Sequence, residues 1–415
     1  MFSQEVLQLS AQAKTALRDV FAGLEQTAEA NQFRVMRAFA DNRVSEGDFA
    51  GTTGYGYNDR GRDTLDRVLA ACFGCESALV RHNFVSGTHA LTVALFALLR
   101  PGDLLLSATG KPYDTLEQVI GIAAGGGGSL AEFGVRYQDV PLSGGRTVDY
   151  AGLERALQAR PKVVYAQRSR GYGEREGLSC AQLNELYAFV KRVSPASYVV
   201  VDNCYGEFLE TEEPKADLLV GSFIKNPGGG LADTGGYVAG SAACVELAAC
   251  RLTSPGIGGV GIGTEQGATM GQNKSLYKGL FYAPHTVLQA LKTAAFAAYI
   301  LDRLGYDVSP GPFEKRLDLV QSIHFRSERK LVAFCRGIQA GSPVDAFAVP
   351  EPWDMPGYQH KVIMAAGTFT QGASIELSAD APIREPYTLY LQGGLTFESG
   401  VYGVLHGVER LLAER

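Results

Sequence analysis

Short apolar runs rich in β-formers alternate with helical stretches between residues 78 and 239, and this alternation limits the possible folds more than any other feature. Strands and helices in alternation form an open, mostly parallel α/β sheet. The predicted strands are Ala78–Arg81, Leu104–Ala108, Lys162–Ala166, Tyr198–Asp202, Leu218–Phe223 and Tyr237–Ala239. The predicted helices between them are Thr88–Leu99, Thr115–Ala123 and Ala181–Val193.

The pattern changes after about residue 285. A long helix rich in Ala and Leu is predicted over Val287–Leu304, and a less repetitive α+β segment follows it. The first 21 residues have the pattern of an amphipathic helix rather than of a signal peptide. We therefore expect an N-terminal helical arm over residues 1–50, a large sheet domain over 51–285 and a small C-terminal domain over 286–415.

The composition is that of a folded protein without a general affinity for polyanions. The 415 residues include 38 Lys and Arg against 44 Asp and Glu, so the net charge of −6 gives no electrostatic reason to coat nucleic acid or an anionic membrane. Seven cysteines, an odd number spread along the chain, fit reduced thiols better than a disulfide framework. No apolar run reaches the length of a membrane span, and the six histidines form no HExxH motif. We expect a cytoplasmic protein with no metal site.

Glycine is abundant and clustered. The chain has 50 glycines, grouped mainly within residues 51–61, 123–129, 225–230 and 254–263. Clustered glycines let the backbone approach a ligand closely, and a ligand with a phosphate is the first candidate. Gly256, Gly258 and Gly261 fit G-x-G-x-x-G, but a helix-like segment precedes them instead of a strand, so we do not expect a dinucleotide site there.

Two predicted strands end in residues suited to chemistry. Asp202 ends the apolar run YVVVD, and Ser222 ends DLLVGS, which Lys225 and NPGGG follow. Ligands of open α/β sheets bind beyond the carboxyl ends of the strands. A carboxylate and a lysine at neighbouring strand ends also occur as a structural ion pair. The glycine run after Lys225 favours a site, because it is expected to clear space around the amine.

Pyridoxal phosphate requires residues of these types. It needs a lysine for its Schiff base, an aspartate that keeps the pyridine nitrogen protonated, and a glycine-containing helix N-terminus for its phosphate. The segment FVSGTHAL supplies the third part, since Ser86, Gly87 and Thr88 precede a predicted helix whose first N–H groups can bind a dianion. Taken alone, Ser86 is equally well interpreted as an ordinary N-cap.

From about residue 54 to its end, the sequence resembles the fold type I pyridoxal-phosphate enzymes of cysteine and methionine metabolism. Within them it is most similar to the methionine γ-lyase-like subgroup, also called aluminium resistance proteins or cystathionine β-lyase-like proteins. The resemblance rests on eight motifs in order: GYGYNDRGRDTL, SGTHAL, TGKPYDTLEQVIG, QRSRGY, VDNCYGEF, GSFIKNPGGGLADTGGY, PEPWDMPGY and IREPYTLYLQGGLTFE. It implies a large, mostly parallel seven-stranded sheet domain and a smaller C-terminal α+β domain.

The resemblance also implies roles for individual residues at the cofactor. Lys225 would form the Schiff base and Asp202 would pair with the pyridine nitrogen, while Gly87, Thr88 and the hydroxyl of Ser222 would bind the phosphate. Tyr113 would stack on the pyridine ring, unless it is an ordinary core tyrosine. In the wider group a tyrosine and an arginine cross to the neighbouring subunit's phosphate. Here they would be Tyr57 with Arg60 or Arg62, since Asp59 stands where the arginine usually lies.

An amino-acid substrate needs a group that holds its carboxylate, preferably a bidentate arginine. After Arg336 the chain has only Arg384, Arg410 and Arg415, and the last two lie in a predicted terminal helix. Arg384 is thus the candidate, and the family would place such a clamp in the small domain. A surface arginine before a turn is the alternative. Arg168 and Arg170, in QRSRGY, lie where relatives commonly have acidic or small residues, so we expect an altered side-chain pocket.

The implied activity is that of a carbon–sulfur lyase. A β- or γ-elimination from a sulfur-containing or related amino acid would proceed through a Lys225 aldimine and give ammonia and a 2-oxo acid, with Tyr113 as a further acid. Once the substrate has displaced Lys225, the site is expected to lower the pKa of the freed amine, which removes the α-proton. Two alternatives stay open: the same cofactor used for γ-replacement, transamination or elimination from a non-sulfur amino acid, and a non-catalytic stress-response protein on the same fold. The expected assembly is a homodimer or homotetramer with shared active sites.

Overall fold

A computed structural model describes residues 2–123, 127–255, 267–355 and 360–414. The chain divides into two compact units, one of residues 31–282 and the other of residues 1–30 together with 283–415. Two long helices, α2 (Arg18–Asp41) and α9 (Asn273–Arg303), contribute residues to both units. The predicted glycine motif at Gly256, Gly258 and Gly261 lies outside the described residues.

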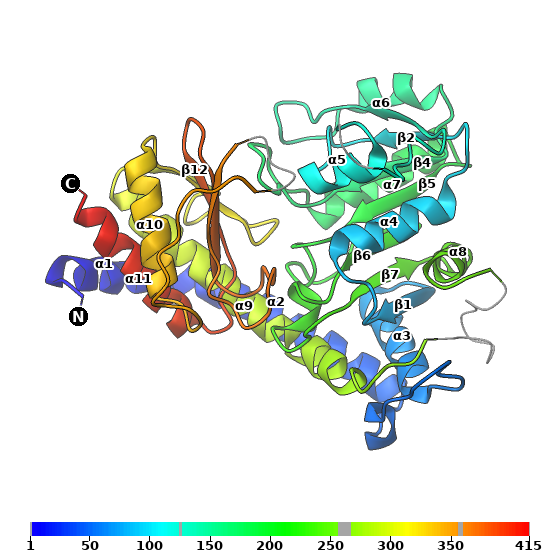
Figure 1. The fold of residues 1–415 in the computed structure, drawn as a ribbon, viewed down its shortest axis with the longest axis horizontal. Coiled ribbons are helices and arrows are strands. Elements are labelled where there is room, and N and C mark those ends of the chain that lie inside the picture. The colour runs from blue at the N-terminus through cyan, green and yellow to red at the C-terminus, as the bar shows by residue number, and fades with distance from the viewer. Residues whose placement is uncertain (1, 124–126, 256–266, 356–359, 415) are drawn as a thin grey trace. The chain divides into compact units, whose positions relative to one another are not determined.

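The larger unit is built on a seven-stranded sheet (Figure 1). Its strands, in the order β1-β7-β6-β5-β4-β2-β3, are Ser77–Arg81, Gly236–Gly240, Leu218–Ser222, Tyr198–Asp202, Val163–Gln167, Leu104–Ser107 and Arg136–Asp139. Strands β3, β2, β4, β5 and β6 are parallel, and β7 is antiparallel to both of its neighbours. The mostly parallel α/β sheet predicted from the sequence is confirmed.

The six predicted strands are all present, and one further strand was not expected. β3 lies at the edge of the sheet and consists of the polar residues Arg136–Asp139, half of them exposed. An edge strand has only one neighbour, so a strand of polar residues is tolerated there and leaves no apolar run in the sequence.

Helices cover the sheet and bury its apolar strands. They are α3 (Arg60–Phe73), α4 (Gly87–Leu98), α5 (Asp114–Ile120), α6 (Tyr150–Leu157), α7 (Cys180–Val193) and α8 (Ala242–Leu252), with short 3-10 turns at Glu46–Phe49 and Asn226–Gly228. α4 packs on β6 and β7 and contacts α8, while α3 packs on β1. The strand residues Val163, Val200, Leu218 and Val238 share one apolar core with α4 and α8. Helix α4 therefore lies directly against buried strands of the sheet.

The smaller unit has its own antiparallel sheet. Its strands, in the order β10-β11-β12-β9-β8, are Val362–Ala365, Ser378–Pro382, Thr388–Gln392, Gln321–His324 and Asp307–Ser309. The helices of this unit include α1 (Gln4–Ala16), α10 (Glu328–Ala340) and α11 (Phe397–Leu412), which share one apolar core with the sheet. The main-chain N–H of Ser3, the N-cap of α1, donates to the Glu409 carboxylate of α11 at 2.9 Å. This hydrogen bond joins the first helix to the last.

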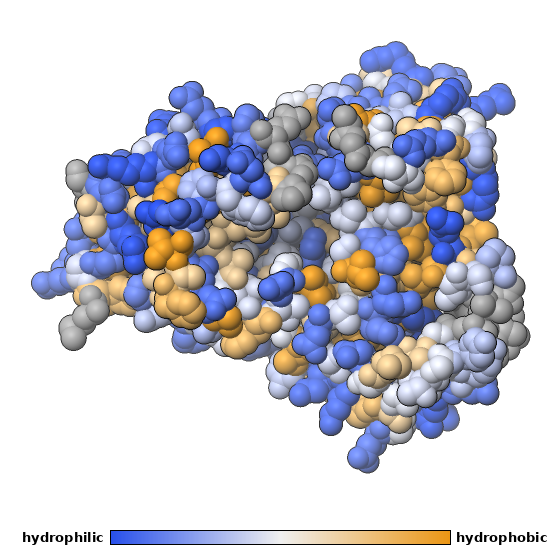
Figure 2. Space-filling model, viewed as in Figure 1, coloured by the Kyte–Doolittle hydropathy of each residue, from blue (hydrophilic) through white to orange (hydrophobic). Residues whose placement is uncertain are grey.

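The face of the molecule in Figure 2 is mostly hydrophilic, with apolar side chains scattered between polar ones. Over the described ranges, no helix combines the length and the apolar character that a membrane crossing needs.

Candidate active site

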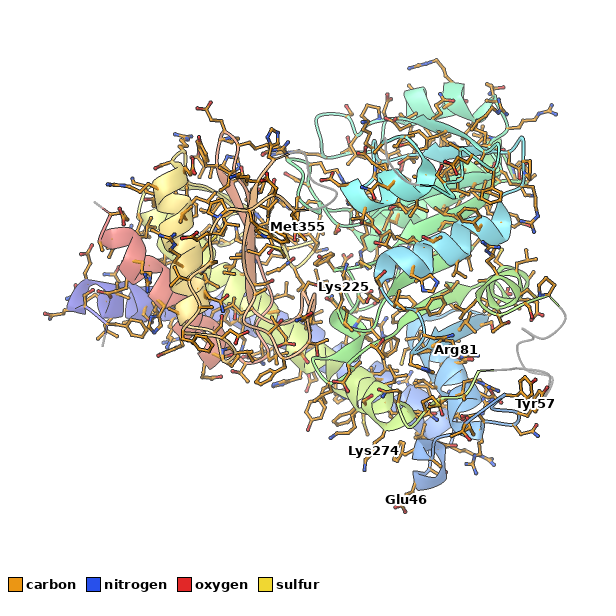
Figure 3. The ribbon with its side chains drawn as sticks, in the orientation of Figure 1. Glu46, Tyr57, Arg81, Lys225, Lys274 and Met355 are labelled. Carbon is orange, nitrogen blue, oxygen red and sulfur yellow. The ribbon has the colours of Figure 1, made fainter. Side chains whose placement is uncertain are left out.

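The carboxyl ends of β4, β5 and β6 bring polar residues together at one edge of the large sheet. In the parallel register Gln167 lies opposite Asp202, and Asp202 lies opposite Val220, two residues before Ser222. Lys225 follows at the start of a 3-10 turn, where its main-chain N–H donates to the Ser222 carbonyl at 3.3 Å. The edge where open α/β sheets bind ligands therefore carries a carboxylate, a hydroxyl and an amine. Figure 3 labels Lys225 at this place.

The Asp202 side chain is buried and held from two sides. Its Oδ1 accepts the main-chain N–H of Cys204 at 3.1 Å, and its Oδ2 accepts the Tyr165 hydroxyl at 3.4 Å. Burial raises the pKa of the carboxyl, and the charge of Lys225 opposes this change. A nearby cation stabilises the ionised form of such a buried carboxyl. A protonated pyridine nitrogen would be such a cation.

The amine of Lys225 is partly buried between several polar groups. Burial alone would lower its pKa, but Cys204, Tyr205, Asp202 and Tyr113 outweigh burial, and the pKa is raised. The pKa is raised because charge interactions, with Cys204 first and then Tyr205 and Asp202, favour the charged form of the amine. The expected lowering concerns the amine that a bound substrate frees, and it stays a prediction.

The N-terminus of α4 fits a phosphate group. Ser86 is the N-cap, and its hydroxyl accepts the main-chain N–H of His89 at 3.0 Å, so the N-cap interpretation of its side chain holds. Gly87 and Thr88 open the helix, where main-chain N–H groups have no intrahelical acceptor and the helix dipole favours an anion. A Cβ at Gly87 would lie 3.2 Å from Cys204 Sγ and 4.0 Å from Lys225 Nζ. Only glycine leaves this space beside the amine open.

Ser222 lies next to this helix start. A Cβ at Gly87 would also lie 3.5 Å from the Ser222 Cβ. Ser222 is fully buried, and its hydroxyl donates weakly to the Gly235 carbonyl at 3.4 Å. The donor set of helix N–H groups and a hydroxyl suits a dianion.

Tyr113 stands at the start of α5 on another side of the same site. Its hydroxyl lies 2.9 Å from the Thr88 hydroxyl, and its main-chain N–H donates to Gln167 Oε1 at 3.2 Å. Burial, and then the negative charge of Asp202, raise the pKa of the phenol. The structure thus brings Tyr113 together with Thr88, Asp202 and Lys225, although the two ends of this set are more than a hundred residues apart in sequence.

Gly228, the first glycine of the run after Lys225, serves backbone packing rather than space at the amine. A Cβ at Gly228 would lie 1.6 Å from the Phe223 carbonyl oxygen, and a Cβ at Gly279 of α9 would lie 2.4 Å from the Gly228 carbonyl oxygen. Gly228 lets the lysine loop fold tightly on itself, and Gly279 lets α9 approach the backbone of that loop. The glycine that opens space at the amine is Gly87.

Arg168 does not line this site, so the interpretation of an altered pocket was wrong for it. Its side chain is fully buried and binds the Asn203 Oδ1 at 2.7 Å, Glu213 Oε2 at 3.1 Å and Glu210 Oε2 at 3.3 Å. Side chains alternate across a strand, so its neighbour Gln167 faces the site while Arg168 points the other way. Arg170 is also buried.

The loop before α3 holds the residues predicted to serve a neighbouring subunit. Tyr57 is half exposed and lies well away from Lys225 within the same unit (Figure 3). Arg62 is buried, and its guanidinium donates to the carbonyls of Gly56 at 2.9 Å and Gly267 at 3.0 Å. Arg60 is mostly exposed, although its Nε contacts Asp48 Oδ1 at 2.9 Å. Of the two arginines, Arg60 is the one placed at the surface.

Arg384 belongs to the smaller unit. It lies in the turn between β11 and β12, where its main-chain carbonyl accepts the N–H of Tyr387 at 2.7 Å, and its side chain is exposed. Its role as a carboxylate clamp stays a prediction.

Four residues of the site escaped prediction: Gln167, Tyr165, Cys204 and Tyr205. Gln167 could have been found by the rule that identified Asp202, because it is also the last residue of a strand. Cys204 and Tyr205 directly follow Asp202, but nothing in the sequence shows which side chains of a turn point back. Within the described part of the chain, no cluster of His, Cys, Asp and Glu could hold a metal ion.

The sequence and the fold both have close matches among known proteins. The family model for methionine gamma-lyase matches residues 6–412. "Uncharacterized protein YnbB" of Bacillus subtilis is 47% identical over 396 residues, which are 94% of this chain and 93% of that protein. A carbon-sulfur lyase involved in aluminum resistance from Clostridium novyi NT is 47% identical with a TM-score of 0.93, and the match covers 99% of this chain and 96% of that one.

A further solved structure agrees, and a distant one shares the fold alone. The "putative cystathionine beta-lyase involved in aluminum resistance" from Clostridium acetobutylicum is 48% identical with a TM-score of 0.95, covering 99% of this chain and 96% of that one. Cystathionine gamma synthase from Xanthomonas oryzae pv. oryzae is 18% identical with a TM-score of 0.58. The predicted fold type I architecture and the resemblance on which it rests are confirmed. The chain belongs to the methionine gamma-lyase family.

Proposed function

We propose that the protein is a pyridoxal-phosphate-dependent carbon–sulfur lyase that acts on sulfur-containing amino acids. The observation that carries the proposal is the meeting of Lys225, Asp202 and the start of α4 at one edge of the sheet, with Gly87 leaving space beside the amine. The names of the related structures, among them a carbon-sulfur lyase, support it.

The residues divide between binding the cofactor and moving protons. The N–H groups of Gly87 and Thr88, with the Ser222 hydroxyl, hold the phosphate, and Asp202 holds the proton of the pyridine nitrogen. When bound, pyridoxal phosphate supplies an electron-withdrawing ring that stabilises negative charge on the substrate's α-carbon. Tyr113 covers one side of the site.

Lys225 Nζ is the proposed proton carrier. It takes the proton from the substrate's α-carbon and delivers a proton to the sulfur as the carbon–sulfur bond breaks. For a leaving group on Cβ, the net reaction consumes water and releases a thiol, ammonia and a 2-oxo acid. For a leaving group on Cγ, a second proton must leave Cβ. Arg384 is the proposed clamp for the substrate carboxylate.

A panel assay tests the activity. The protein is supplied with pyridoxal phosphate and with cystathionine, methionine, cysteine conjugates or serine, and both thiol and 2-oxo acid are measured. The proposal predicts equal release of thiol and 2-oxo acid from at least one sulfur amino acid. The activity should be absent in Lys225→Ala and retained in Lys274→Ala, because Lys274 is exposed (Figure 3). Release of 2-oxo acid without thiol from the sulfur amino acids, or activity that survives Lys225→Ala, would contradict it.

A further inference from the structure

Tyr205 has a backbone conformation that its side chain disfavours. It is the third residue of the turn Asn203–Gly206, which the Gly206 N–H closes by donating to the Asn203 carbonyl at 2.9 Å. Its φ is 70°, in the left-handed region where glycine or asparagine is normally found. A large residue kept in such a conformation costs on the order of 1 kcal/mol or more and persists where the surroundings fix it, often at functional sites.

The surroundings of this turn do fix it. Asn203 is fully buried, accepts Arg168 Nη1 at 2.7 Å and donates to Glu213 Oε2 at 3.0 Å. The Arg168 side chain passes so close to Gly206 that a Cβ there would lie 2.3 Å from its Cδ. Phe208, also at a positive φ of 63°, donates its N–H to Glu213 Oε1 at 2.9 Å. The buried arginine network therefore holds the turn in its strained form.

The result of this conformation is a contact with the reactive amine. Lys225 Nζ lies 4.1 Å from the centroid of the Tyr205 ring, the shortest cation–ring distance in the described part of the chain. An ammonium group over an aromatic face is stabilised relative to the neutral amine, more so when it is partly removed from water. The other titratable groups that act on this amine are Cys204, Asp202, Tyr113 and Glu207.

We propose that Tyr205 is a positioning residue for Lys225, whose ring holds the free amine at the site and favours its ammonium form. This inference rests on the role of Lys225 given under Proposed function. In that role the ammonium form carries the proton that the departing sulfur needs. The strained turn is thus the means by which the fold places an aromatic face under the proton carrier.

The test measures the pKa of the Lys225 amine directly, without substrate. Full-length protein stripped of cofactor is labelled competitively with acetic anhydride over a range of pH, and the peptide containing Lys225 is quantified by mass spectrometry. We expect Tyr205→Leu and Tyr205→Asn to lower this pKa by about one unit, a tenfold change in the neutral fraction. Tyr205→Phe, which keeps the ring, should stay near the wild-type value. Asparagine tolerates a positive φ, so Tyr205→Asn removes the ring without adding strain.

Tyr198→Leu is the matched control. Tyr198 begins the same strand β5 and also carries a lysine over its ring, with Lys162 Nζ at 5.0 Å from the centroid, but at the opposite end of the strand. This variant should leave the pKa of Lys225 unchanged. The inference is overturned if the Leu and Asn variants leave that pKa unchanged, or if the Phe variant lowers it as much as they do.

The outcome separates this inference from the proposed function. If wild-type protein fails to bind pyridoxal phosphate through Lys225, the proposed function fails, and the labelling experiment still reports on the ring and the amine. If the cofactor binds but the loss of the ring changes nothing, only the role of Tyr205 fails.

Discussion

At the residue scale, the site combines groups whose ionisation is set by burial. Glu207 shows this most clearly. It is fully buried just beyond the Asp202 turn, its Oε1 accepts the Tyr237 hydroxyl at 2.8 Å, and its Oε2 has no partner among the described residues. Burial raises its pKa from 4.5 to about 8. At neutral pH the side chain is therefore mostly a neutral acid.

Because the pKa of Glu207 is raised in the folded protein, the free energy of unfolding depends on pH in a definite direction. Below about pH 4.5 both the folded and unfolded chains hold the proton, and between that value and about 8 only the folded chain does. The free energy of unfolding should thus fall with rising pH by up to about 1.4 kcal/mol per unit in this window. Glu207→Gln removes the titration and keeps an acceptor for Tyr237. The free energy of unfolding, measured by chemical denaturation, is compared between the variant and the wild type at pH 5 and pH 8. The variant should be more stable relative to wild type at pH 8 than at pH 5. The same difference at both pH values would disprove the raised pKa.

The cysteines illustrate what could be predicted at this scale. Cys72 and Cys75 form a CxxC whose sequence predicts a helix end, and α3 does end at Phe73, with Gly74 in the left-handed region at φ 67°. Burial raises the pKa of both thiols to about 12, so neither is a reactive thiolate. Local turn chemistry was predictable here because it depends on neighbours in sequence. The orientation of Arg168 was not, because its partners Asn203 and Glu213 come from a distant segment.

At the element scale, the sequence predicted buried strands well and long-range packing poorly. The strands β4, β5 and β6 are continuous apolar runs, which burial on both faces of a parallel sheet requires. Helix α9, by contrast, begins at Asn273, fourteen residues before the predicted start at Val287. It continues through Pro284. A proline removes a helix hydrogen bond, and no local pattern shows that tertiary packing will compensate for it.

A pair of glycines within helices tests the packing of the lysine loop. Gly23 in α2 is exposed, and a Cβ there would have no atom within 4 Å, whereas a Cβ at Gly279 in α9 would lie 2.4 Å from the Gly228 carbonyl oxygen. Gly→Ala in an open helix stabilises by up to about 1 kcal/mol. Gly23→Ala should therefore raise the melting temperature, and Gly279→Ala should lower it because the clash costs about 1–3 kcal/mol or more.

The same variants report on function. Gly279→Ala should also weaken cofactor binding, since the displaced backbone carries Lys225, while Gly23→Ala should not. Equal effects of the two substitutions on thermal unfolding and on cofactor affinity would show that the lysine loop does not depend on this contact.

At the scale of the whole molecule, the loop that carries Tyr57 bears on the expected assembly. Tyr57 lies well away from Lys225 in its own unit (Figure 3). Its exposed ring packs beside Tyr55, at 5.5 Å between centroids. The buried Arg62 holds this loop by donating to the Gly56 carbonyl. The family resemblance assigns this loop to the neighbouring subunit's phosphate. We therefore propose a homodimer, or a dimer of dimers, with shared sites.

Complementation tests this assembly. Lys225→Ala and Tyr57→Ala should each lower activity strongly when prepared alone. When the two variants are unfolded and refolded together, a mixed dimer has one intact site of two, so about a quarter of wild-type activity should return for random pairing. Arg60→Ala mixed with Lys225→Ala should behave likewise if Arg60 accompanies Tyr57, whereas activity no higher than that of the separate variants would exclude sharing.

The central claim is that Lys225 is the residue that binds pyridoxal phosphate, and borohydride reduction tests it most directly. The protein is saturated with the cofactor, reduced and digested, and the peptides are examined by mass spectrometry for a phosphopyridoxyl group. The structure predicts one modified lysine, Lys225, with loss of the visible absorption band on reduction, and no adduct in Lys225→Ala. An adduct on another lysine such as Lys274, or none in the wild-type protein, would contradict the account.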